Sequence, residues 1–451
     1  MATMPHESSR FALTEETHME LSYSRQLPVW KEYDVLVCGA GPAGICAAVA
    51  AARQGARTAL VERYGIPGGN LTSGCVGPIL GSVSQGTMRD EVVALLGVPD
   101  NDMDGTTGVA HDMERAKIAL TKLLDEKNLE VYLQTPVADA WMEGNRIRGA
   151  VVCTKEGLRV LAAQTVIDAT GDGDVAVFAG CDYQKGREDG LMQPVTVEFT
   201  LDNVDEDRGI LCIGDIDDVS FRGQRFLDWT KAQAEQGNIP KNTAAVRLHP
   251  TVYPGSRQVN TTQVNGVDST KVETLYRAEL ELRQQMEILT DFFRRQLPGY
   301  ERCKIVGSAS TTGIRESRRI TGDYCITGQE CASGARFPDV IVHKADFLVD
   351  IHNPTGAGQA EKKIQYCIPY DLPYGCFVPR KVEGLYVAGR CISGTHRAHA
   401  SYRVMSICMA MGQAVGIAAA LCAQTHCTPR QLNVTHLQAT LTSLGIDLFS
   451  E

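Results

Sequence analysis

Three glycines with the spacing G-x-G-x-x-G, at Gly39, Gly41 and Gly44, follow directly after the apolar run 33–37. Glycines at this spacing let the backbone approach a pyrophosphate, which binds at the positive N-terminus of the next helix. Glu62 lies 18 residues after the third glycine, where an acid accepts hydrogen bonds from ribose hydroxyls. These residues predict a dinucleotide site. Because an acid there disfavours a 2′-phosphate, they favour NAD or FAD over NADP.

The segments around these glycines predict a complete β-α-β unit. Residues 33–37 have the short apolar pattern of a buried strand, and residues 45–55 are the small, apolar residues of a helix that ends at a glycine. A second strand at 57–61 ends directly before Glu62. The loop 63–74 is rich in Gly, Asn and Thr, and ligands collect where the strands of open α/β sheets end. We therefore expect this loop to contact the ligand.

A second strand, polar loop and helix recur late in the chain. The run 385–388 is apolar and is followed by Gly389 and Arg390, and a long apolar helix is predicted from about Ser401 onwards. His396 and His399 lie between them. A hydride transfer needs a group that takes or gives the accompanying proton, and histidine has a suitable pKa. The alternative is that both histidines are structural, while Arg403 can anchor a carboxylate.

Three arginines, Arg315, Arg318 and Arg319, lie within five positions of a net-acidic chain. Two interpretations remain open. The arginines can form ion pairs with Glu316 and Asp323, or they can recognise a carboxylate or a cofactor phosphate, since the guanidinium fork fits both.

Other polar residues supply weaker candidates. His352 is a further candidate active-site residue. Asp172 and Asp174 form an acidic pair, but no further ligands follow at metal-loop spacing, and the chain has no C-x-x-C pair. The sequence therefore predicts no metal site.

The remaining segments predict an α/β fold with an insert. We expect a helix at 110–128, strands at 130–133, 138–142, 146–154 and 158–162, strands at 192–201 and 245–249, and an amphipathic helix at 272–297. The predicted domains are an N-terminal tail (1–30), a first part of a Rossmann-like dinucleotide-binding domain (31–190), an inserted α+β substrate domain (191–310), the second part of the binding domain (311–425) and a C-terminal tail (426–451).

Composition excludes several classes of protein. The 451 residues carry a net charge of −10, with only 6% aromatic residues, so we expect no nucleic-acid partner. The apolar stretch 404–423 contains a glutamine and two glycines, which we interpret as a buried helix rather than a membrane span. The 15 cysteines form no disulfide framework and the N-terminus lacks a signal peptide, so we expect a cytoplasmic protein.

The chain resembles the FAD-dependent oxidoreductases, a family with the glutathione-reductase-like FAD fold that is related more distantly to fumarate reductase flavoproteins. The resemblance rests on the β-α-β unit with Glu62, on segments 68–74, 169–172, 315–320 and 350–352, and on 384–405. It implies FAD as the cofactor. The FAD-binding residues that it implies are Gly39, Gly41, Pro42, Ala43, Gly44, Glu62, Arg63, Gly69, Asn70, Val137, Ala169, Gly171, Gly389, Arg390, Ser401 and Val404.

The resemblance together with the polar residues predicts hydride transfer between FAD and a small-molecule substrate. We expect oxidation of an alcohol, hydroxy acid or amine, or reduction of an activated double bond. The expected catalytic residues are His396, His399 and Arg403, and the expected substrate-binding residues are Arg315, Arg319 and His352. A flavin monooxygenase and a flavin-bound RNA-modifying protein are the alternatives. The sequence identifies neither the electron acceptor nor the oligomeric state, and a homo-oligomer stays open.

Overall fold

The computed structural model describes residues 24–97, 109–214, 219–361 and 363–450. Its largest sheet has seven strands, in the order β3-β2-β1-β6-β5-β4, with β17 paired to β6. The strands are β1 (Val29–Cys38), β2 (Thr58–Val61), β3 (Leu129–Tyr132), β4 (Val137–Glu143), β5 (Arg146–Thr154), β6 (Gly157–Asp168) and β17 (Leu385–Val387).

The long strand β6 joins two kinds of sheet. Its first half pairs antiparallel with β5, and its second half lies parallel between β1 and β17. The parallel strands β3, β2, β1, β6 and β17 therefore end at one edge. Gly39, Glu62, Ala169 and Ala388 each follow directly after one of these strands, so segments far apart in the sequence meet at that edge.

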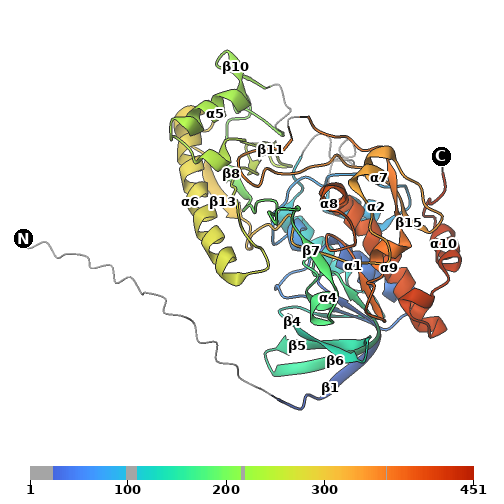
Figure 1. The fold of residues 1–451 in the computed structure, drawn as a ribbon. Helices are drawn as coiled ribbons and strands as arrows, with labels where there is room; N and C mark the ends of the chain where they lie inside the picture. Colours follow the sequence, from blue (N-terminus) through green and yellow to red (C-terminus); the bar gives the residue numbers. More distant parts are fainter. Residues whose placement is uncertain (1–23, 98–108, 215–218, 362, 451) are drawn as a thin grey trace, which may run out of the picture.

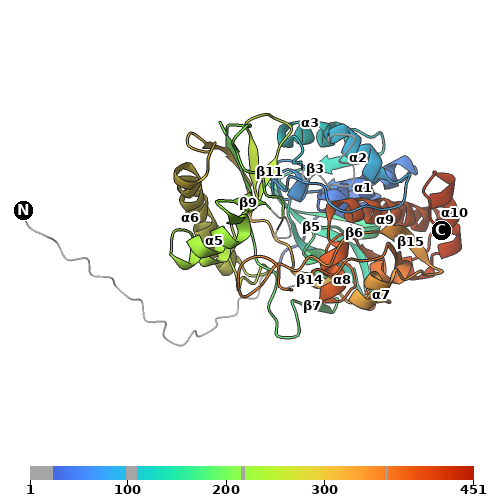
Figure 2. The ribbon, with the colours of Figure 1, turned by 90° about the horizontal axis from the view of Figure 1, so that it is seen from above.

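Two helices from opposite ends of the chain pack against each other beside this sheet. They are α1 (Pro42–Arg53) and α9 (Met405–Thr425), which lie side by side in Figures 1 and 2. A Cβ atom at Gly412 would lie 1.9 Å from the carbonyl oxygen of Ala43, so only glycine permits this approach. In the described part of the chain, α9 is the one helix long and apolar enough to cross a membrane, and it is buried inside the fold.

Shorter helices cover the rest of this core. They are α2 (Met88–Leu96), α3 (Met113–Leu123), α4 (Asp174–Phe178), α7 (Gly328–Ser333), α8 (His396–Tyr402) and α10 (Val434–Ser443), with 3-10 turns η1 (Gly69–Leu71), η4 (Tyr374–Phe377) and η5 (Pro429–Gln431). Two small antiparallel pairs complete it, β7 (Tyr183–Lys185) with β14 (Arg318–Ile320) and β15 (Val340–Ala345) with β16 (Tyr370–Pro373).

A second hydrophobic core lies between residues 195 and 314, on the left of Figure 1. It joins a four-stranded antiparallel sheet to the long helix α6 (Val272–Gln296). The sheet order is β11-β12-β8-β13, built from β8 (Phe199–Asp202), β11 (Leu248–Pro250), β12 (Arg257–Val259) and β13 (Lys304–Ser308), with α5 (Phe226–Glu235), the hairpin β9 (Ser220–Phe221) and β10 (Gln224–Arg225), and the turn η3 (Lys241–Thr243) beside it.

The predicted α/β fold with a parallel dinucleotide-binding sheet is confirmed. Two parts of the prediction were wrong. The strands expected at 192–201 and 245–249 begin only at Phe199 and Leu248. Residues 426–450 are no tail, because α10 packs its Leu437 and Leu441 into the main core. Of the predicted N-terminal tail, residues 1–23 lie outside the described residues.

Candidate active site

A large cavity opens at the edge where the parallel strands end. It encloses about 1180 Å³ of empty space, part of which is open to solvent. Most of the predicted cofactor residues line it: Gly39, Gly41, Pro42, Ala43, Glu62, Arg63, Gly69, Asn70, Val137, Ala169, Gly171, Gly389 and Arg390. Residues from six separate segments of the chain thus converge on one space, which we call the first cavity.

The glycines of the β1–α1 turn have different physical roles. Gly39 has φ +100°, and a Cβ atom there would lie 2.5 Å from the Ala169 carbonyl oxygen. Gly44 does not line the cavity; a Cβ atom on it would collide with the carbonyl oxygen of Gly39, so it allows α1 to pack closely. A Cβ atom at Gly41 would meet no other atom within 4 Å, so the space beside this residue is open. The turn therefore forms a cradle in which backbone N–H groups and the α1 N-terminus can approach a pyrophosphate.

The carboxylate of Glu62 is held at the end of β2. Its Oε2 accepts a hydrogen bond from the Ala40 N–H (2.6 Å), and its Oε1 accepts one from the Tyr64 N–H (2.9 Å). The side chain is buried yet lines the cavity. These contacts orient the acid toward the place predicted for ribose hydroxyls, and together with the glycine cradle they fit an FAD molecule.

A second cavity adjoins the first. The two share Asn70, Ile314, Arg390, Arg403 and Met405 in their walls. The second cavity encloses about 730 Å³ of empty space between the dinucleotide sheet and the second core. A molecule in it would lie next to a cofactor in the first cavity.

Helix α9 begins at this junction. The structure corrects the predicted start of the helix, because α8 (His396–Tyr402) ends before a break at Val404, and α9 begins at Met405. Val404 lines the second cavity, whereas Ser401 lines neither. The Ser401 hydroxyl is buried and donates to the Phe347 carbonyl oxygen (2.6 Å), so Ser401 is not placed to bind the cofactor.

One wall of the second cavity carries a buried group of charges around Asp350. Arg403 donates to Asp350 Oδ2 (2.6 Å), and His352 Nε2 lies 3.4 Å from the same oxygen. Although burial opposes it, the contacts with His352 and Arg403 hold the pKa of Asp350 well below its usual range. Burial, helped by the nearby Arg315, lowers the pKa of His352 to about 4, so this histidine is neutral at neutral pH.

Glu198 faces the same cavity directly before strand β8. Burial raises its pKa to about 7, because an ionised carboxylate is poorly solvated there, while the Gln258 amide opposes the shift by donating to Oε2 (3.2 Å). Arg315 lies in the same wall, and burial lowers its pKa to about 9, with the charge of Arg403 adding to the shift. The cavity thus holds an acid that changes charge near neutral pH.

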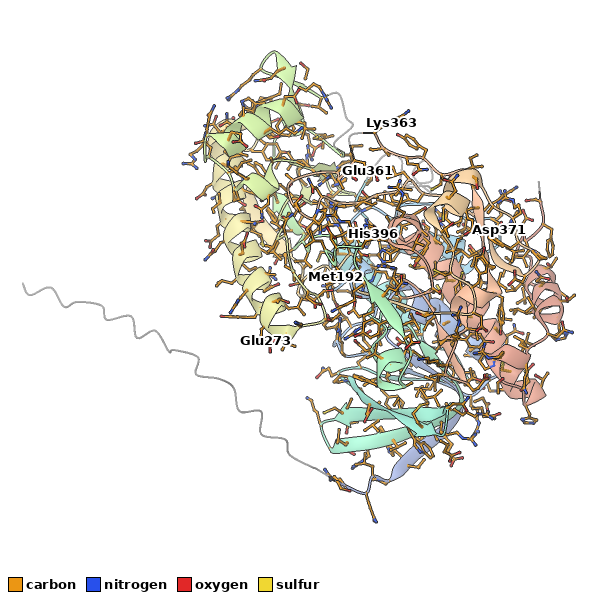
Figure 3. The ribbon with its side chains drawn as sticks, in the orientation of Figure 1. Met192, Glu273, Glu361, Lys363, Asp371 and His396 are labelled. Carbon is orange, nitrogen blue, oxygen red and sulfur yellow. The ribbon has the colours of Figure 1, made fainter. Side chains whose placement is uncertain are left out.

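The two predicted catalytic histidines are not in either cavity. Figure 3 places His396 in the middle of the molecule, and its Nδ1 lies 2.8 Å from Glu316 Oε1. His399 is buried one turn further along α8, and burial holds its pKa well below the usual range. Both belong to the packing of α8, so the prediction that they line the active site was wrong.

Of the three clustered arginines, one lines a cavity. Arg319 is buried, pairs with Glu316 (2.5 Å) and donates to the carbonyl oxygens of Gly394 and Gly186, so it is not available to a substrate. Arg318 pairs with Asp174 (2.7 Å). Both therefore form ion pairs, but the predicted partner Asp323 is wrong, because Asp323 pairs with Arg430. Arg315 lines the second cavity together with the predicted His352 and Arg403.

Sequence reasoning missed Glu198. A signal for it exists in the alternation of residues 195–201, where the buried apolar positions are Val195, Val197, Phe199 and Leu201. At the alternate positions 196, 198 and 200, Glu198 is the single charged residue. Only the fold, however, brings Glu198 to the carboxyl ends of the distant parallel strands.

A glycine cradle at the end of a parallel sheet, with a second cavity beside it, defines a dinucleotide-binding protein with a Rossmann-like fold. The family model for FAD dependent oxidoreductase matches residues 34–441, and the chain belongs to this family. FAD is the cofactor, as predicted, and the family is that of FAD-dependent oxidoreductases.

Curated relatives match only part of this chain. A thiamine thiazole synthase from Pyrococcus horikoshii is 30% identical over 169 residues, which are 35% of this chain and 65% of that protein. The tRNA uridine 5-carboxymethylaminomethyl modification enzyme MnmG from Geobacter sulfurreducens is 31% identical over 159 residues, which are 31% of this chain and 24% of that enzyme. The chain thus spans less than two thirds of the length of either relative.

Among solved structures, a geranylgeranyl bacteriochlorophyll reductase-like protein from Thermoplasma acidophilum aligns with 92% of this chain and 84% of its own. Its TM-score is 0.47 and its sequence identity is 14%.

Proposed function

We propose that the protein oxidises a small polar substrate, an alcohol, hydroxy acid or amine, in the second cavity, or that it reduces an activated double bond there. The observation that carries the proposal is the junction of the two cavities, whose walls share Asn70, Arg403 and Met405. A substrate in the second cavity would meet the cofactor without leaving the protein.

The chain's own residues divide the work of this reaction. FAD, when bound, accepts or donates the hydride. Asp350 holds Arg403 in place by accepting a hydrogen bond from it. The buried Nδ1 of His352 has no hydrogen-bond partner among the described residues, so it is a polar contact for substrate. The residue that takes the proton from a substrate hydroxyl or amine is Glu198.

Glu198 suits proton transfer better than its neighbours. A general base works best when its pKa lies near the working pH. The pKa of Glu198 is about 7, whereas that of His352 is about 4 and that of Asp350 lies well below its usual range. Glu198 can therefore both accept a proton and release it again.

The experiment described below also tests two alternative functions. MnmG, a relative over part of this chain, is by name a tRNA modification enzyme, but a net charge of −10 opposes binding of a polyanion. A flavin monooxygenase would need NAD(P)H and oxygen. The two-cavity arrangement favours neither.

The test is anaerobic mixing of the FAD-loaded protein, in the dark, with a panel of alcohols, 2-hydroxy acids and amines, while the absorbance of oxidised flavin is followed. We expect at least one class to bleach the flavin. If no class bleaches it, while NADPH does and a hydroxylated product appears in air, the protein is a monooxygenase. Salt-sensitive binding of tRNA without bleaching would favour the RNA-modifying function.

A further inference from the structure

Arg315 is a half-buried cation that lines the second cavity and has no carboxylate partner among the described residues. Its Nη1 donates to the Pro194 carbonyl oxygen (3.0 Å) and to Thr196 Oγ1 (2.6 Å), and its Nη2 donates to Asn260 Oδ1 (3.3 Å). In the described part of the chain, no carboxylate lies within ion-pair distance of the guanidinium. Neutral acceptors therefore orient this charge but do not neutralise it.

Two deeply buried arginines of the same chain do have a counter-ion. Arg257 is 2% exposed and pairs with Glu206 at 2.6 Å, and Arg319 is 4% exposed and pairs with Glu316 at 2.5 Å. Burying a charge without a partner is costly, and a ligand that supplies the opposite charge recovers that cost. Arg315 is built differently from these structural arginines.

The acids of the cavity do not supply the missing charge. In a contact ion pair the pKa of the acid falls and that of the arginine rises. The pKa of Glu198 instead rises to about 7 and that of Arg315 falls to about 9, because burial dominates both. Asp350 is already bound to Arg403 (2.6 Å). The cavity therefore keeps an excess of positive charge at Arg315.

The hydrogen bonds of Arg315 indicate the shape of the missing anion. A guanidinium has five N–H donors, and the described residues accept three of them from Arg315. This leaves one N–H on Nη2 and the N–H of Nε. Two donors on one planar group match the two oxygens of a carboxylate. Arg315 lines only the second cavity, so this anion is a substrate group rather than a cofactor phosphate.

Extending the proposed function, on which this inference rests, we propose that the substrate carries a carboxylate and that Arg315 binds it. The substrate class is then a small 2-hydroxy or 2-amino acid. The carboxylate and the oxidised carbon are neighbours in such a molecule, which suits a cavity lined by both Arg315 and Glu198.

The test measures binding without turnover. The oxidation of either substrate class leads to a 2-oxo acid, the amino acid after hydrolysis of its imine. Pyruvate, 2-oxobutyrate and phenylpyruvate are therefore titrated into the FAD-loaded protein, each beside its neutral carboxamide, and binding is measured calorimetrically. We expect at least one oxo acid to bind roughly 10- to 100-fold more tightly than its amide, as for a hydrogen-bonded charge pair.

Arg315→Met should abolish this preference, and Arg315→Lys should retain part of it, because lysine keeps the charge but not the fork. Arg336→Met, at an exposed arginine outside both cavities, is the control and should keep the preference. Equal binding of acids and amides by the wild type would overturn the inference, as would a preference that survives Arg315→Met and is lost in Arg403→Met. Flavin bleaching by neutral alcohols or amines would leave the proposed function standing in either case.

Discussion

Replacing Glu198 by glutamine should remove the proton acceptor while keeping its shape. Glutamine is nearly isosteric, and its side-chain oxygen can still accept the hydrogen bond from the Gln258 amide. Proton transfer by a positioned side chain is worth about 10²–10⁴-fold in rate. We therefore expect anaerobic flavin reduction by the best substrate to slow by roughly that factor in Glu198→Gln.

The pH dependence gives a sharper signature. The wild-type rate of substrate oxidation should rise with pH, because the ionised carboxylate is the base and its pKa is about 7. Between about pH 6 and pH 8 the ionised fraction rises roughly tenfold. The groups that oppose burial in setting this pKa are Gln258, Arg315, the Gly77 N–H and Arg247. In Glu198→Gln the rise should vanish.

A stability measurement separates this role from a loss of structure. A pKa raised from 4.5 to about 7 means that the folded protein retains a proton which the unfolded chain releases. As pH rises through this window, the free energy of unfolding should fall by about 3 kcal/mol from this group alone. Glu198→Gln lacks this fall, so it should lose less stability than the wild type between about pH 5 and pH 8.

The control for Glu198→Gln is Asp346→Asn, at a partly buried acid whose pKa is also raised by burial but which lines neither cavity. It should leave both the rate and its pH profile unchanged. An unchanged rate in Glu198→Gln, or a pH-dependent rise that survives the substitution, would refute the assignment of the base.

Further predictions concern packing rather than chemistry. His396→Ala and His399→Ala should each lower stability but keep flavin reduction within about tenfold of the wild type, since neither residue lines a cavity; a loss of roughly 10²–10⁴-fold with normal FAD content would contradict this. Gly412→Ala should lower the free energy of unfolding by about 1–3 kcal/mol, measured by denaturant titration, because its Cβ would lie 1.9 Å from the Ala43 oxygen. An unchanged stability would mean that α1 and α9 are not packed this closely.

Local sequence order was sufficient to predict the cofactor side of the site. The glycine turn and Glu62 lie within one β-α-β unit, so their spacing alone specifies where they meet the ligand. The same holds for Gly389 and Arg390, which follow strand β17 directly. Gly39, Gly41, Glu62, Gly389 and Arg390 all line the first cavity.

The substrate side could not be predicted in the same way. Glu198, Arg315 and His352 come from three distant segments, and only the packing of the second core against the sheet brings them to the same cavity. The histidine prediction failed for a local reason. Thr395 accepts a hydrogen bond from the Ala398 N–H and begins a separate short helix, which turns His399 into the core.

The central claim is that substrate is oxidised in the second cavity, beside the FAD cavity. The most direct measurement compares flavin reduction in Val76→Phe and Val83→Phe. Val76 lines the second cavity but not the first, whereas Val83 packs on the same core and lines neither cavity. We predict that both variants bind FAD and that substrate bleaches the flavin in Val83→Phe but at least roughly tenfold more slowly in Val76→Phe. Equal rates in the two variants would contradict the account.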